Sequence, residues 1–127
     1  MAEITMKEFD ERLNSLECPD SIRQIVGLLR TAAKQAGPVS WRPHATPNGG
    51  WGITGKRDGR VFCQFDPKPA ALHVCADVVG ASDRELMAAG TVHTRKNARS
   101  WVDIRDARGA KALEPLIVRA YAEAGQA

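Results

Sequence analysis

The stretch that decides the fold is RVFCQFDPKPAALHVCADVV, residues 60–79. Both of its ends alternate as strands do, and the proline-bearing middle predicts a turn. We therefore expect two antiparallel strands, paired so that Phe65 lies opposite Ala71. In that register Cys63 lies directly opposite His73 on the neighbouring strand, and Cys75 lies on the same face of the sheet.

The residues before this hairpin predict two helices followed by a loop. Thr5 and Glu8 form a capping-box pattern, and apolar residues follow at helical spacing as far as Leu16. Cys18-Pro19 separates this helix from a second one, which stops at Gly37-Pro38. Residues 38–50 are rich in proline and glycine, so they predict a loop with a short extended piece near Trp41.

The remaining elements complete one domain. Residues 51–56 predict a strand that leads through an Asp-Gly turn into the hairpin. Ser82 is expected to cap a short helix that ends at Gly90. Residues 100–105 predict another strand. A last helix begins near Asp106, with Pro115 in its first turn. The order ααβββαβα predicts a single α+β domain over residues 1–127. We expect an antiparallel meander of about four strands, covered by helices mainly on one face.

Composition places the chain among globular proteins of the reducing cytoplasm. Of its 127 residues, 43% are hydrophobic and 26% are charged. Its three cysteines lack the spacing of a disulfide framework, and the N-terminus lacks an apolar signal region. No apolar run approaches the roughly 20 residues that a bilayer span needs. The net charge of +3 permits an anionic partner without requiring one.

Basic residues interleaved with an aromatic residue give the first functional hypothesis, a non-enzymatic module that binds nucleic acid. One group lies in and beside the first turn, and the other lies at the start of the last strand. If the two groups are adjacent, they offer cations to phosphates and a ring on which a base can stack. The predicted contact residues are Lys56, Arg57, Arg60, Arg95, Lys96, Arg99 and Trp101.

Tryptophan and histidine residues give the second hypothesis, a protein that binds or sequesters a small molecule. Aromatic side chains with nearby imidazoles are typical of a pocket between a sheet and its helices. The predicted lining residues are Trp41, Trp51, His73 and His93.

A third hypothesis is a weak zinc or iron site at Cys63, His73 and Cys75, with His93 as a fourth ligand. It depends on the guessed hairpin register, and a shift of one residue removes it. There is no CxxC or HxxxH pattern, so we predict neither a resident metal nor a cofactor. Nucleophile-elbow and P-loop motifs are also missing from the sequence, which argues against an enzyme.

Three segments resemble the YjbR/MmcQ-like group and the neighbouring YdhG-type domains. They are SIRQIVGLLRTAAKQAGPV (residues 21–39), RVFCQFDPKPAALHVCADV (residues 60–78) and the tail ARSWVDI with LEPLIVRAYAEA (residues 98–104 and 113–124). The tail is also similar to a luciferase-like domain. The resemblance implies a double-wing-like α+β fold and DNA binding, and it brings no catalytic residues. Iron delivery, described for some YdhG-type relatives, would require an exposed acidic face. This chain is net basic, which argues against that role here.

Overall fold

The computed structural model describes residues 2–45, 49–94 and 99–126. Within these residues an antiparallel sheet and its helices form the predicted α+β architecture. The helical segments are α1 (Met6–Leu13), α2 (Asp20–Ala36), the 3-10 turn η1 (Pro69–Ala71), α3 (Asp83–Leu86) and α4 (Ala107–Ala124). The strands are β1 (Ala2–Glu3), β2 (Ser40–Ala45), β3 (Trp51–Arg57), β4 (Arg60–Lys68), β5 (His73–Val78), β6 (Thr91–Thr94) and β7 (Ser100–Ile104).

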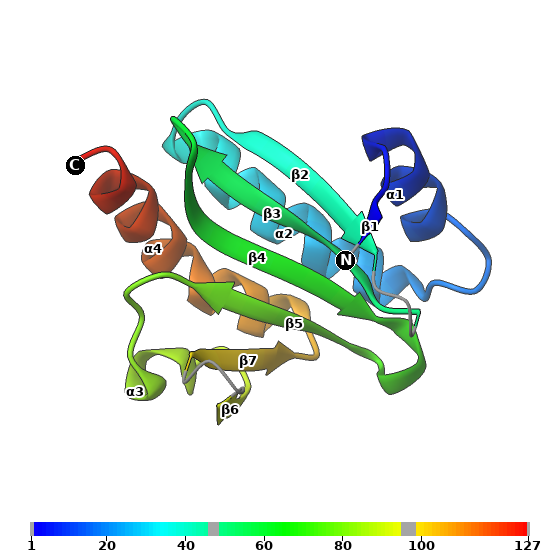
Figure 1. The fold of residues 1–127 in the computed structure, drawn as a ribbon. Helices are drawn as coiled ribbons and strands as arrows, with labels where there is room; N and C mark the ends of the chain where they lie inside the picture. Colours follow the sequence, from blue (N-terminus) through cyan, green and yellow to red (C-terminus); the bar gives the residue numbers. More distant parts are fainter. Residues whose placement is uncertain (1, 46–48, 95–98, 127) are drawn as a thin grey trace.

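The seven strands of the described residues lie in the order β1-β2-β3-β4-β5-β7-β6. Helices α2 and α4 pack beside each other against β4 and β5, and Figure 1 shows them behind the sheet. Alternate strand residues point into this layer and fill the core with Ile53, Phe65, Val74, Ala76, Val102 and Ile104. None of the described helices has the length and apolarity needed to cross a membrane.

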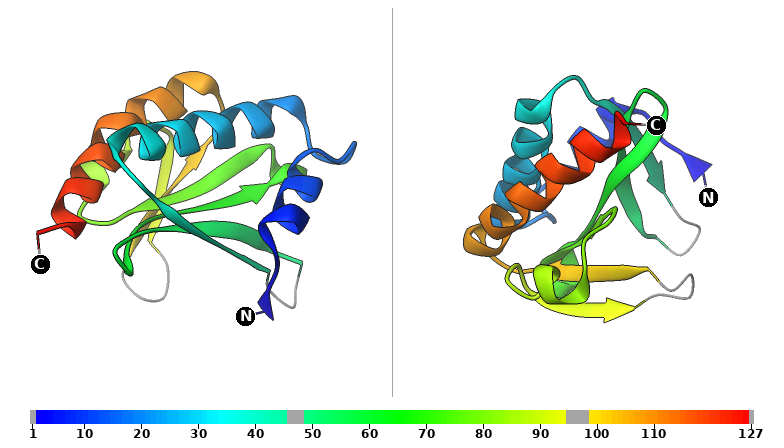
Figure 2. Two further views of the ribbon diagram at one scale, coloured as in Figure 1. Left: turned by 90° about the horizontal axis from the view of Figure 1, so that it is seen from above. Right: turned by 90° about the vertical axis from the view of Figure 1, so that its left-hand side faces the viewer.

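The sheet bends strongly, so its two faces differ in shape. The right-hand view of Figure 2 shows β2 and β3 at one end, and β7 and β6 at the other, projecting away from α2 and α4. We call the face on the inside of this bend, opposite α2 and α4, the open face. Some side chains on this face, among them Cys75 and Asp66, are buried although neither of these helices covers them.

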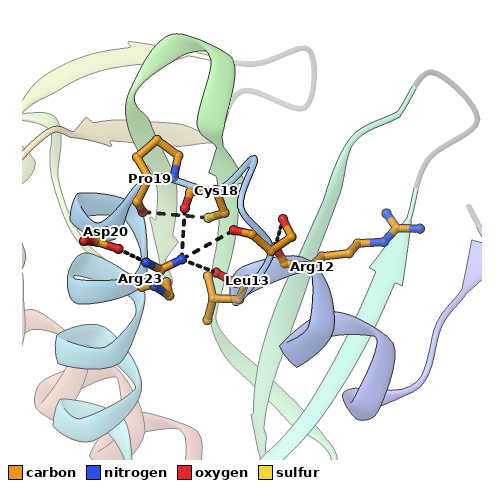
Figure 3. Close-up of polar contacts among 7 residues, drawn as sticks. Arg12, Leu13, Cys18, Pro19, Asp20 and Arg23 are labelled. Atoms are coloured by element: carbon orange, nitrogen blue, oxygen red, sulfur yellow. Dashed lines mark hydrogen bonds and ion pairs between the residues drawn. The ribbon is translucent and has the colours of Figure 1, made fainter.

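Arg23 joins the first two helices. Its guanidinium donates hydrogen bonds to the carbonyl of Cys18 at 2.9 Å and to that of Leu13 at 3.4 Å, and it forms an ion pair with Asp20 (Figure 3). Carbonyls at the end of a helix have no partner within the helix, and a cationic side chain can satisfy them. Arg23 thus fixes the angle at which the chain leaves α1.

Strands β1 and β6 were not predicted, and β2 was predicted only as a short extended piece near Trp41 within a loop. The proline-rich stretch after Gly37 contains β2, with Pro43 opposite Ile53. Proline is tolerated because β1 pairs only with His44 and Ala45, so Pro43 lies on a free edge of β2. The sheet is therefore larger than the predicted meander of about four strands, and β6 adds an edge beyond β7.

The predicted register of the central hairpin is wrong. Phe65 pairs with Ala76 rather than Ala71, and Cys63 pairs with Val78. The reason is that β4 continues through Pro67 to Lys68, so the turn falls later, at η1. The pairing of β3 with β4 ends at Ile53 and Phe65, so Pro67 is paired on one side only. The shift is by an odd number of residues, which places Cys63 and Cys75 on opposite faces.

The helix predictions hold with three corrections, one of which is that α3 ends at Leu86 rather than at Gly90. Thr5 caps α1 through the backbone N–H of Glu8, and Ser82 forms a capping box with Glu85. However, α1 ends at Leu13, so Leu16 is fully exposed instead of completing the apolar stripe. Pro115 lies inside α4 rather than in its first turn. Its ring is exposed, so the carbonyl that its missing N–H leaves free is accessible to water.

Candidate metal centre

The polar residues of the sheet gather on the open face. One row crosses the sheet from strand to strand. His44 pairs with Gly52, the Asp66 side chain lies against Gly52, and Asp66, Cys75, Asp103 and Thr91 pair in turn. All three histidines of the chain lie on this face, because His73 is on β5 beside Cys75 and His93 is on β6 opposite Trp101. The alternation that sends apolar residues toward the helices sends this set to the other side.

Cys75, His93 and Asp103 form a compact cluster of metal-ligand atoms. Cys75 Sγ lies 3.5 Å from His93 Nε2, and His93 Nε2 lies 3.0 Å from Asp103 Oδ1. One donor atom from each of the three lies within 4.8 Å of the others. His73 Nε2 lies 3.5 Å from the same Asp103 oxygen. The four donors come from β5, β6 and β7, so strand register sets their positions.

The atoms that meet in this cluster distinguish a metal site from a catalytic triad. In a Cys-His-Asp triad, one ring nitrogen faces the thiol and the other faces the carboxylate. Here His93 Nε2 alone contacts both Cys75 and Asp103. Thiolate, imidazole and carboxylate donors that converge on one point are the ligand set of zinc and similar divalent ions.

His44 and Asp66 form a second polar group further along the row. His44 Nε2 lies 3.3 Å from Asp66 Oδ1, and the amide of Gln64 donates to the same oxygen at 3.2 Å. His44 and Asp66 belong to β2 and β4, and β3 runs between them. They meet because β3 carries Gly52 at this point, and a Cβ there would lie 2.1 Å from Asp66 Oδ1.

Cys63 and Cys75 lie on opposite faces of the sheet and differ in their surroundings. Cys63 points toward the helices, and its side chain is fully buried among apolar residues. Burial raises the pKa of its thiol far above the ordinary value, because a thiolate would lose its hydration there. Cys63 is therefore a core residue, and the predicted cluster of Cys63 with His73 and Cys75 does not form. Of its two other members, Cys75 belongs to the observed cluster, and His73 lies beside it in contact with Asp103.

The predicted nucleic-acid residues are divided among several environments. Arg57 stacks on the ring of Tyr121 at 4.3 Å and donates to its carbonyl at 3.0 Å, and Arg99 forms an ion pair with the buried Asp77. Trp101 is only 4% exposed, so its ring is not a stacking surface. Lys56 is partly exposed and Arg60 is exposed, whereas Arg95 and Lys96 lie outside the described residues.

The predicted pocket residues lie on two different faces. Trp51 packs edge-on against Phe9, and Trp41 packs near Phe65, so both tryptophans belong to the helix side. His73 and His93 lie on the open face, beside Asp103. The structure does not bring these four residues together.

In comparisons with known proteins, no protein-family model, no curated protein and no solved structure matches this chain. The site must therefore be interpreted from its own geometry. Sequence reasoning named three of the four donors but not Asp103. The alternation of Ser100–Ile104 carried that information, since it puts Asp103 on the face opposite Val102 and Ile104.

Proposed function

We propose that this protein binds one divalent transition-metal ion of the zinc class on its open face. Cys75, His93 and Asp103 are the ligands, and His73 is the fourth residue within reach. The observation that carries the proposal is the convergence of three different donor types on one point. It modifies the third sequence hypothesis by replacing Cys63 with Asp103.

The distances support a metal of this size. Tetrahedral zinc, with bonds of about 2.0 Å to nitrogen or oxygen and about 2.3 Å to sulfur, separates its ligand atoms by about 3.3–3.8 Å. The 3.5 Å between sulfur and nitrogen falls in this range, and the 3.0 Å between nitrogen and oxygen is slightly below it. Calcium and magnesium are disfavoured because both take oxygen ligands almost exclusively.

Burial also supports a structured site. Cys75 is 1% exposed, and the Asp103 side chain is 17% exposed. A carboxylate in such a setting needs polar or charged partners, and a bound cation would add one to His73 and His93.

The test is metal analysis and zinc titration of the full chain purified without chelator. We expect one equivalent per chain, with affinity reduced roughly 100-fold or more in Cys75→Ser and in His93→Ala, since even outer-shell changes cost 10–100-fold. Cys63→Ala is the matched control, because it removes a strand cysteine from the opposite face. Absence of zinc binding, or equal binding by Cys75→Ser and wild type, refutes the proposal.

Nucleic-acid binding is a second candidate, favoured by one observation. Val61, next to Arg60, lines the same hollow of about 450 Å³ as Arg99, so the first hairpin and the start of β7 meet at one end of the sheet. Binding to single-stranded or duplex nucleic acid should then weaken with salt and in Arg60→Ala. No binding at low salt would exclude it.

A further inference from the structure

His44 and Asp66 are ionisable side chains that are buried in the sheet, at positions where apolar residues would be less costly. They are 8% and 7% exposed, and neither α2 nor α4 lies on their face. Burying ionisable side chains is costly unless they are paired and hydrogen-bonded, as these two are with each other and with Gln64. The pairing requires a glycine at position 52. The contact between His44 and Asp66 therefore depends on three neighbouring strands, β2, β3 and β4.

A groove of about 480 Å³ opens onto this pair, within the size range of small-ligand pockets. Its lining combines His44 and Asp66 with Trp51 and with Lys68, the cationic residue at the end of β4. A larger hollow of about 740 Å³ adjoins it beside α1, but several charged residues of that helix line it instead.

The groove is joined to the metal cluster through backbone pairing. Asp66 is the direct partner of Cys75, and Lys68 is the direct partner of His73. Neighbouring strands lie about 4.8 Å apart, so Cys75 and His73 lie one strand beyond the groove, whose lining includes neither of them. Lys68 attracts an anion within the groove, and the proposed cation adds positive charge on the neighbouring strands.

We propose that this groove binds a small hydroxycarboxylate. The carboxylate lies toward Lys68 and the metal cluster, where positive charge collects. The hydroxyl lies at His44 and Asp66, which together supply a hydrogen-bond donor and an acceptor. The contribution of the metal's charge rests on the proposed function, whereas the contacts with Lys68 and His44 do not.

The test is an NMR titration of the zinc-treated full chain with glycolate, and with glycolamide as the uncharged analogue. We expect saturable shifts at the backbone amides of Gly49, Gly50 and Ala70 with glycolate only. Lys68→Gln and His44→Ala should each weaken binding at least tenfold. Lys56→Gln, a strand lysine distant from the groove, should not. No saturable shift, equal binding of glycolamide, or unchanged binding by Lys68→Gln would overturn the proposal.

Metal content measured on the same samples separates the two proposals. If zinc binds but glycolate does not, the groove proposal fails and the metal site stands. If zinc does not bind, but glycolate binds and depends on Lys68 and His44, the groove proposal stands without the contribution of the metal's charge.

Discussion

Cys75 on β5 and Asp103 on β7 are direct backbone partners, and both side chains lie on the open face. His93 reaches them from β6, the next strand. Three donors from three strands can converge only when both strand pairings are correct. The metal site is therefore a product of the folded sheet, and metal binding and folding should be coupled.

The first prediction follows from that coupling. Zinc at 100 times its dissociation constant should stabilise the wild-type chain by about 2.7 kcal/mol, because it binds the native state preferentially. Thermal unfolding with zinc and with chelator measures the difference. Cys63→Ala should keep the zinc-dependent shift, while Cys75→Ser should lose it. A shift of equal size in Cys75→Ser would mean that zinc binds elsewhere.

The second prediction concerns the glycine between His44 and Asp66. Gly52→Ala should destabilise the protein by about 1–3 kcal/mol, because the new Cβ would lie 2.6 Å from the carbonyl oxygen of Phe65 as well as against Asp66. Gly27→Ala is the matched control. That glycine is helical, and a Cβ added to it would meet no neighbouring atom within 4 Å, so alanine should stabilise by about 0.5–1 kcal/mol. Urea unfolding of both variants gives the comparison, and a neutral Gly52→Ala would contradict the described packing.

The third prediction concerns the junction of α1 and α2. Arg23→Ala should lower the free energy of unfolding by about 1–3 kcal/mol, because the carbonyls of Leu13 and Cys18 lose their donor. Arg12→Ala, an exposed arginine of α1, should change it by less than about 0.5 kcal/mol. Denaturant unfolding decides between them. Equal effects of the two substitutions would show that Arg23 does not hold the junction.

The fourth prediction is a pH dependence that arises at Glu85. Hydrogen bonds from Arg119, and then from Ser82, lower the pKa of Glu85 from 4.5 to about 2. Because the folded pKa is the lower one, the stabilisation is complete above pH 4.5 and disappears as the pH falls toward 2. Glu85→Gln should be less stable than wild type at neutral pH, and the gap should narrow over that interval. Urea midpoints measured across this range test it, with Glu114→Gln as an exposed control. A gap that is constant with pH would contradict the ion pair.

Much of the architecture was predictable because it depends on local patterns. Thr5, Ser82 and Asp106 are capping residues whose helices begin where expected. The alternation around Phe65 and Val102 correctly indicated strands. The short strands were missed for local reasons too, since β2 contains Pro43 and β6 has only four residues of weak pattern.

The site was not predictable because it depends on pairing between distant segments. His73, Cys75 and His93 were recognised as possible ligands, but the turn was placed too early in the hairpin. That error assigned Cys63 to their face. Asp103 was missed for a separate reason, because it joins them only through the pairing of β5 with β7. Similarly, nothing local to His44 indicates that Asp66 lies across a glycine from it. Periodicity identifies faces, whereas register decides which residues meet.

Cobalt substitution tests the central claim most directly, because a cobalt ion bound to a thiolate shows a near-ultraviolet charge-transfer band and tetrahedral visible bands. We predict that the wild-type chain and Cys63→Ala both develop these bands with one equivalent of cobalt. Cys75→Ser should lose the charge-transfer band, and His93→Ala should bind cobalt more weakly. A wild-type chain without the charge-transfer band, or a Cys75→Ser variant that keeps it, would contradict a metal centre at Cys75, His93 and Asp103.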